Sequence, residues 1–177
     1  MRLELGDGFS IREFDRDDIP ALVRHADNEK VARSLEDRFP HPYTQADAET
    51  WLDHVAAQDP STQFAIAARA EVIGGIGFRL LEDVYRGTAE LGYWLGEDYW
   101  GRGLATRAVR AFSAWIFEEF PVDRIQARVF DRNPASCRVL EKAGYTREGH
   151  LRHSIRKMNL LMDQVVYAIL RNESATR

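Results

Sequence analysis

The segment from Tyr99 to Thr106 reads YWGRGLAT and combines backbone freedom with an expected helix start. Glycine permits close approach of a ligand and adopts positive φ at little steric cost. A helix that begins near Gly103 leaves the N–H groups of its first turn without intrahelical partners, which suits an anion. The segment therefore predicts a pyrophosphate site, to which Arg102 and Arg107 could add charge. A tight turn that binds nothing is the alternative.

A second motif follows downstream and reads NPAS at 133–136, then VLEKAGY at 139–145. Asn133 can cap the helix that Pro134 begins, and Gly144 can end it as the C′ residue. Taken alone, this pattern predicts a capped helix and nothing more. The functional interpretation is that Asn133 and Ser136 also face a ligand from the same helix end.

The rest of the chain must position these two motifs. Helices are expected from an N-cap at Asp15 or Asp17 to about Asp27 with Pro20 near the start, after Thr44, from Gly103 to Pro121, and over 135–143. Strands are expected over 9–14, 64–69, 72–81, 88–95, 124–130 and 165–170. The three strands between 64 and 95 predict an antiparallel meander, so residues 1–177 are expected to form a single α+β domain. Residues 172–177 are expected to be a frayed tail.

Composition narrows the class of protein. The 177 residues are 45% hydrophobic and 29% charged, with a net charge of −4, which is typical of a globular domain and argues against nucleic-acid binding. Neither a signal peptide nor a membrane span is expected, so a cytoplasmic protein is predicted. The single cysteine, Cys137, excludes an internal disulfide, and no metal site is predicted.

The two motifs in this order and spacing, after the strand ELGYWL at 90–95, resemble the GNAT superfamily of acetyltransferases. The closest branch is the RimJ/RimL type, which includes enzymes that acetylate the N-termini of ribosomal proteins. FPHPYT at 39–44 is similar to that branch's substrate-side segment, and Asp163 matches its acidic residue before the last strand. The resemblance implies a mixed, mostly antiparallel central sheet with helices on both faces.

The resemblance also implies how acetyl-CoA binds as co-substrate, without a metal. The strand backbone would pair with the pantetheine amides, the glycine loop would hold the pyrophosphate, and Asn133 would bond near the thioester end. The implied cofactor-binding residues are Tyr93, Trp94, Leu95, Gly101, Arg102, Gly103, Leu104, Ala105, Thr106 and Asn133. His41 and Tyr43 are implied on the acceptor side.

Three positions depart from the family pattern. Trp100 stands where the loop often opens with Gln or Arg. Leu140 replaces the Tyr that many relatives use as an acid, and Arg128 replaces a Glu that some use as a base. Ser136 is the substitute predicted as acid, and Glu90 the substitute predicted as base.

The acceptor is predicted from the demand for a base. An α-amine of pKa ~7.8 costs about 1 kcal/mol to deprotonate at pH 7, whereas a lysine of pKa ~10.4 costs about 4.6 kcal/mol. A site without a strong base therefore favours an α-amine, and the leading hypothesis is direct transfer from acetyl-CoA to a protein or peptide N-terminus in a ternary complex. The alternatives are a small-molecule (antibiotic, polyamine or amino acid) acetyltransferase, a non-catalytic acyl-CoA-binding module and an unrelated phosphate-binding fold. The final strand, expected to be exposed, suggests a homodimer.

Overall fold

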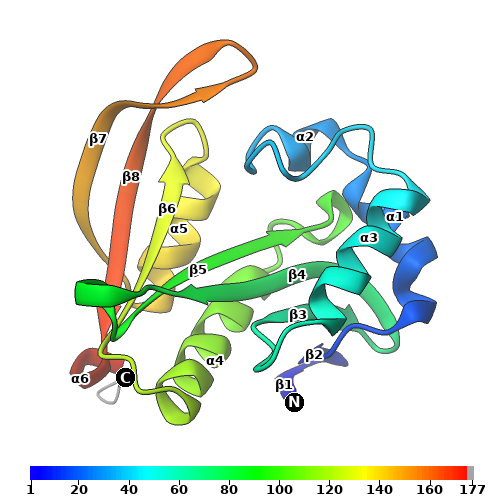
Figure 1. The fold of residues 1–177 in the computed structure, drawn as a ribbon, viewed down its shortest axis with the longest axis horizontal. Coiled ribbons are helices and arrows are strands. Elements are labelled where there is room, and N and C mark those ends of the chain that lie inside the picture. Colours follow the sequence, from blue (N-terminus) through cyan, green and yellow to red (C-terminus); the bar gives the residue numbers. More distant parts are fainter. Residues whose placement is uncertain (175–177) are drawn as a thin grey trace. The chain divides into compact units, whose positions relative to one another are not determined.

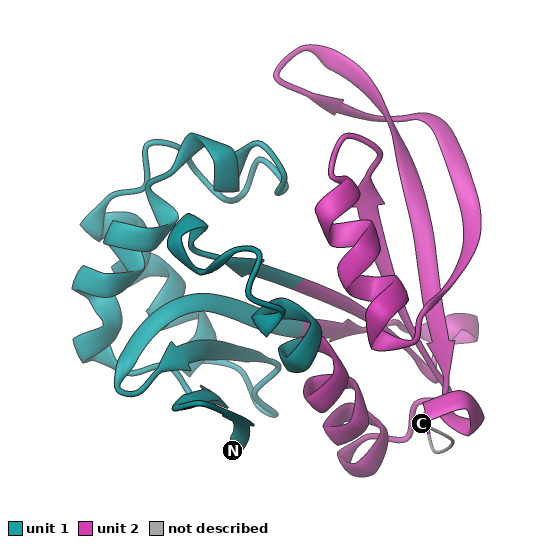
Figure 2. Ribbon diagram, turned by 180° about the vertical axis from the view of Figure 1, so that it is seen from behind, with its two compact units in different colours: residues 1–77, 93–108 teal, residues 78–92, 109–177 magenta. Residues whose placement is uncertain are grey.

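The computed structural model describes residues 1–174, which form two compact units (Figures 1 and 2). Unit 1 comprises residues 1–77 and 93–108, and unit 2 comprises residues 78–92 and 109–174. The chain passes between them inside two strands and one helix. The expectation that residues 1–177 form a single domain stays a prediction, because the division into two compact units does not test it.

Eight strands form a mixed sheet in the order β1-β2-β3-β4-β5-β6-β8-β7, as the α+β fold class requires. The strands are β1 (Arg2–Gly6), β2 (Phe9–Arg12), β3 (Gln63–Ala68), β4 (Glu71–Leu80), β5 (Thr88–Leu95), β6 (Arg124–Phe130), β7 (Thr146–Lys157) and β8 (Leu160–Leu170). The α-helices are α1 (Ile19–Ala26), α2 (Glu29–Ala32), α3 (Gln45–Ala56), α4 (Leu104–Glu119), α5 (Pro134–Ala143) and α6 (Arg171–Ser174). None of these helices is long and apolar enough to span a bilayer.

Unit 1 is built on antiparallel pairing of β1 with β2, β2 with β3, and β3 with β4. Helices α1 and α3 supply apolar side chains to its core, among them Leu22 and Leu52, which are 1% and 5% exposed. The predicted helix start at Thr44 is confirmed as a capping box. The Asp47 N–H donates to Thr44 Oγ1, and the Thr44 N–H donates to the Asp47 carboxylate.

Unit 2 is organised around β6, which pairs in parallel with β5 and antiparallel with β8. Helix α5 lies along the strands of this unit (Figure 1), and the Tyr167 hydroxyl on β8 donates to the Glu141 carboxylate of α5 at 2.8 Å. Gly144 ends α5 with φ 101°, as the motif predicts. The Tyr167 contact thereby fixes the C-terminal half of α5 beside β8.

The structure corrects the expected elements at both ends of the chain. Strand β1, helix α2 and strand β7 were not predicted, and β8 starts at Leu160 instead of Val165. β7 shows little apolar alternation because nearly all of its side chains are exposed. Residues Asn172–Ser174 of the expected tail belong to α6, and 175–177 lie outside the described residues.

The strand order also corrects the position of the final strand. β8 lies between β6 and β7, so β7 ends the order instead. The homodimer stays a prediction, and the strand edge that it would use is that of β7.

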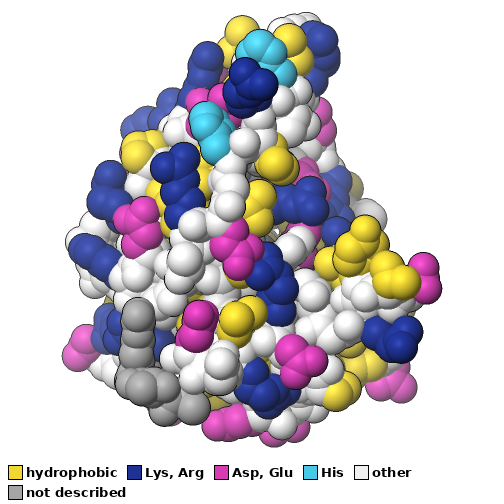
Figure 3. Space-filling model, turned by 90° about the vertical axis from the view of Figure 1, so that its left-hand side faces the viewer, with side chains coloured by type: hydrophobic (Ala, Val, Ile, Leu, Met, Phe, Trp, Pro, Cys, Tyr) yellow, Lys and Arg dark blue, Asp and Glu magenta, His cyan; other side chains and the backbone are white. Residues whose placement is uncertain are grey.

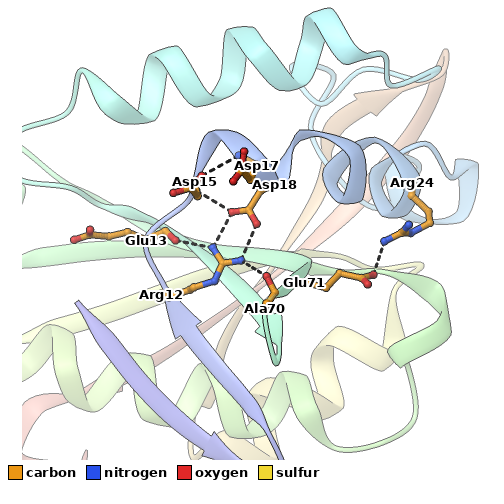
Figure 4. A network of polar contacts seen from close by, with 8 residues as sticks. All are labelled: Arg12, Glu13, Asp15, Asp17, Asp18, Arg24, Ala70 and Glu71. Carbon is orange, nitrogen blue, oxygen red and sulfur yellow. Dashed lines mark hydrogen bonds and ion pairs between the residues drawn. The ribbon is translucent and has the colours of Figure 1, made fainter.

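A buried ion pair fixes the entry to α1 (Figure 4). The Arg12 guanidinium at the end of β2 donates to both Asp18 carboxylate oxygens at 2.7 Å and to the Ala70 carbonyl at 2.8 Å. The Asp15 N–H also donates to Asp18 at 2.8 Å. The Arg12 and Asp18 side chains are only 16% and 5% exposed, so each depends on the other for charge compensation.

Removing that compensation gives the first prediction. Asp18→Ala leaves the Arg12 charge buried without its carboxylate, and we expect the free energy of unfolding to fall by about 3 kcal/mol. The matched control is Asp53→Ala, which removes the Arg16–Asp53 pair, whose side chains are 61% and 64% exposed. That variant should lose less than about 0.5 kcal/mol. Urea unfolding of both variants measures the difference, and equal losses would contradict the assignment.

Candidate active site

The glycine loop of unit 1 has the backbone that its sequence predicts. Gly101 and Gly103 have φ of 75° and 73°, a region that side chains rarely tolerate. A Cβ added at either glycine would meet no other atom within 4 Å, so the space above the loop is open. The first helical bond of α4 runs from the Arg107 N–H to the Gly103 carbonyl. The earlier N–H groups of the turn are thus available to an anion such as a pyrophosphate.

Trp100 ties this loop to the end of β5. Its indole N–H donates to the Leu95 carbonyl at 2.7 Å, although the ring is 43% exposed. The sequence marks Trp100 only as a departure from the family pattern, and an indole bond to a backbone carbonyl leaves no signal in the chain. The bond takes up one acceptor position of Leu95, one of the residues expected to pair with pantetheine.

The two arginines of the loop behave differently. Arg102 places its guanidinium 5.4 Å from the centre of the Tyr99 ring. Arg107 donates to the Leu5 carbonyl and forms an ion pair with Asp7, both at 2.9 Å. Arg107 therefore anchors the β1–β2 hairpin and its charge is balanced there, whereas Arg102 stays the predicted source of positive charge for the pyrophosphate.

The strand expected to receive pantetheine is the end of β5. Leu95 is buried, whereas Tyr93 and Trp94 are half-buried. The Trp94 ring packs edge-on against Phe39 with centroids 5.4 Å apart, which fixes its side chain in the core of unit 1. The pairing of β5 with pantetheine stays a prediction.

The segment expected on the acceptor side lies in unit 1. Asp27 Oδ1 accepts the Tyr43 N–H at 3.0 Å and lies 3.4 Å from His41 Nδ1. Tyr43 is only 6% exposed, and burial raises the pKa of its phenol to about 12, with a smaller contribution from Asp47. The phenol is therefore protonated at neutral pH and packed in the core. His41 is the more accessible of the two residues, and substrate binding by both stays a prediction.

Unit 2 holds Asn133 and Ser136 at the start of α5. Asn133 Oδ1 accepts the Ser136 N–H at 3.1 Å, so the predicted N-cap is confirmed. Leu140, where many relatives have a Tyr, is completely buried and cannot replace that acid. The arrangement keeps Ser136 in the first turn, where the helix dipole favours negative charge.

Glu90 also lies in unit 2, on β5. Its carboxylate accepts from the Gln126 amide at 2.7 Å and from Arg79 at 3.3 Å, and it lies 3.3 Å from Arg128 Nε. Its side chain is 20% exposed. With three donors around it, the carboxylate holds β5 to β6, and its predicted role as base stays a prediction.

Among residues 1–174, no group of three or more His, Cys, Asp or Glu side chains is placed to hold a metal ion.

The open glycine loop generates the second prediction. Gly103→Asn keeps the backbone, since Asn tolerates positive φ, but fills the space above the loop. We expect CoA binding to weaken by roughly tenfold or more, because charge-assisted bonds to the N–H groups are blocked. Gly8→Asn is the matched control, with φ 77° in the β1–β2 turn. Calorimetry should show unchanged CoA affinity for Gly8→Asn, and the same result for Gly103→Asn would remove the pyrophosphate assignment.

Comparison with known proteins gives the family. The model of the acetyltransferase (GNAT) domain matches residues 9–146. The chain is 30% identical over 165 residues to the uncharacterized N-acetyltransferase YnaD of Bacillus subtilis, covering 92% of this chain and 94% of that one. It is 32% identical over 91 residues to the ribosomal-protein-serine acetyltransferase of Escherichia coli, covering 51% and 50% of the two chains.

Among solved structures, RimL, a ribosomal L7/L12 α-N-protein acetyltransferase in complex with coenzyme A, superposes with a TM-score of 0.85. The identity is 20%, with 96% of this chain and 98% of that one covered, so the likeness concerns the fold. The fold, the open glycine loop and the capped α5 agree with the family match, and the chain belongs to the GNAT family of acetyl-CoA-dependent N-acetyltransferases.

Proposed function

We propose that the protein transfers the acetyl group of acetyl-CoA directly to the α-amine of a protein or peptide N-terminus. The single observation that carries the proposal is the open loop at Gly101 and Gly103, whose backbone suits a pyrophosphate. Acetyl-CoA supplies the activated acetyl thioester. The chain's part is to hold this substrate and the amine together, which supplies much of the rate.

The choice of an α-amine rests on two supports. First, one relative, which matches this chain over half of its own length, is named a ribosomal-protein-serine acetyltransferase. In addition, the Glu90 carboxylate is engaged by Gln126, Arg79 and Arg128. At pH 7 a lysine costs about 4.6 kcal/mol to deprotonate, whereas an α-amine costs about 1 kcal/mol. Both supports favour an acceptor that is partly neutral already.

A panel of peptides tests the acceptor class. Each peptide is incubated with acetyl-CoA in three forms: with a free N-terminus, with a blocked N-terminus and an internal lysine, and with both amines blocked. We expect mass spectrometry to find acetylation only on the free N-terminus. Acetylation of the lysine form instead, or of small amines alone, would contradict an N-terminal acceptor.

Ser136 is proposed as the group that donates to the departing thiolate. It occupies the third residue of α5, and its N–H is held by Asn133. Because the cap uses the backbone of Ser136, removal of the hydroxyl should leave the helix start intact. A donor to the leaving group acts mainly in the transition state.

The third prediction follows from that role. Ser136→Ala should lower kcat by ~10²-fold or more with little change in KM for acetyl-CoA. Ser136→Thr keeps a hydroxyl and should retain most of kcat. Steady-state kinetics of both variants from pH 6 to 9 measures the split. Wild-type kcat in Ser136→Ala would show that water or backbone N–H groups stabilise the thiolate.

A further inference from the structure

A histidine–carboxylate pair joins β7 and β8 in unit 2. His150 Nε2 on β7 is 2.8 Å from Asp163 Oδ2 on β8. Asp163 Oδ1 accepts the backbone N–H of His153 at 2.8 Å. The pairing of β7 with β8 shifts register between Leu151 and Ile155, and His153 there has φ 50°. The irregularity in β7 thus directs the His153 N–H toward the Asp163 carboxylate.

These contacts assign the proton on the imidazole. The His153 N–H, and to a lesser extent the charges of His150 and His153, hold the pKa of Asp163 below its usual range, so Asp163 is ionised at neutral pH. An ionised carboxylate only accepts hydrogen bonds, so it receives the N–H of His150 Nε2. In neutral His150 the lone pair is then on Nδ1. A histidine can act as a general base when a carboxylate fixes its tautomer and stabilises its imidazolium form.

The pair is accessible, since the His150 and Asp163 side chains are 46% and 23% exposed. An open hollow of about 730 Å³ is lined by His150, Leu151, Arg152, His153 and Asp163. The Asp163 carbonyl accepts the Asp131 N–H at 3.1 Å, and the Asn133 N–H donates to the Phe130 carbonyl at 2.8 Å. Asp163 is therefore bonded to the same turn that leads from β6 to the Asn133 cap. On the face of the molecule drawn in Figure 3, histidine side chains lie next to Lys and Arg side chains.

Glu90 occupies a different place in unit 2. It faces Gln126 in the pairing of β5 with β6, whereas Asp163 bonds to Asp131, five residues further along. Five residues of extended chain span roughly 16 Å. Variants at the two sites should therefore act independently.

We propose that His150, oriented by Asp163, is the general base that accepts the proton of the acceptor amine. The proposal rests on the proposed function. The protonated α-amine gives a proton to His150 Nδ1, and the freed nitrogen lone pair attacks the thioester carbonyl carbon. As the new N–C bond forms, the C–S bond breaks, and its electron pair leaves with the thiolate. The second proton of the attacking nitrogen goes to solvent. Asp163 balances the charge of the imidazolium until His150 releases its proton to water in the open hollow.

The fourth prediction uses removal and chemical replacement of the imidazole. His150→Ala should lower kcat by ~10²-fold, within the range for general bases, while acetyl-CoA affinity measured by calorimetry stays unchanged. Because the hollow is open, added imidazole should restore part of kcat. Asp163→Asn should lower kcat by roughly tenfold or more, since the tautomer is no longer fixed.

The control is His54→Asn. This variant removes an exposed imidazole on α3, in unit 1, that has no part in the proposed site. It should keep wild-type kcat and show no effect of imidazole, and Ser136→Ala should likewise not be rescued by imidazole.

Other outcomes overturn the proposal. Wild-type kcat in His150→Ala would exclude His150 as the base. If Glu90→Gln loses activity while the kcat of His150→Ala does not respond to added imidazole, the role of base belongs to Glu90. A lower melting temperature or weaker acetyl-CoA binding in His150→Ala, without rescue, would make the histidine structural. In each case the wild-type protein still acetylates its peptide, whereas a wild-type protein that acetylates no N-terminus refutes the proposed function itself.

Discussion

Positive φ at Gly101 and Gly103 is the constraint on which the site in unit 1 depends. A side chain at either position would be strained, and it would also fill the space that a phosphate needs. The constraint is supported from both sides. The Trp100 indole holds the loop to the end of β5, and Leu104, 1% exposed, anchors the first turn of α4 in the core. The loop conformation is thus held by contacts within the protein, which reduces the cost of ordering it on binding.

Unit 2 positions its polar groups through one strand, β6. The turn after Phe130 leads into the Asn133 cap, and the same turn bonds to Asp163 on β8. β8 in turn holds β7, whose irregular pairing brings the His153 N–H to Asp163 and places His150 beside it. The turn after β6 therefore connects the helix that carries Ser136 with the strand pair that carries His150. These two residues are the proposed donor to the thiolate and the proposed acceptor of the amine's proton.

The parts of this arrangement that are local in the chain could be predicted from the sequence. Glycines that need positive φ and the Thr44 and Asn133 caps depend on neighbouring residues, and all are present as expected. Interactions between distant residues could not be predicted. Three such interactions are the Trp100–Leu95 hydrogen bond, the Arg107–Asp7 ion pair and the His150–Asp163 pair. Each depends on the tertiary structure and has no periodic pattern in the sequence. β7 was missed for a related reason, because an exposed basic strand lacks the apolar alternation by which strands are recognised.

The central claim, that the glycine loop binds the pyrophosphate of CoA, is tested most directly by NMR titration of ¹⁵N-labelled protein. We expect the amide signals of Gly101, Gly103 and Leu104 to move with CoA and to stay in place with pantetheine, which lacks the pyrophosphate and the nucleoside. Signals from Tyr93 and Trp94 on β5 should move with both ligands. Loop amides that stay unmoved by saturating CoA, or that move equally with pantetheine, would contradict the claim.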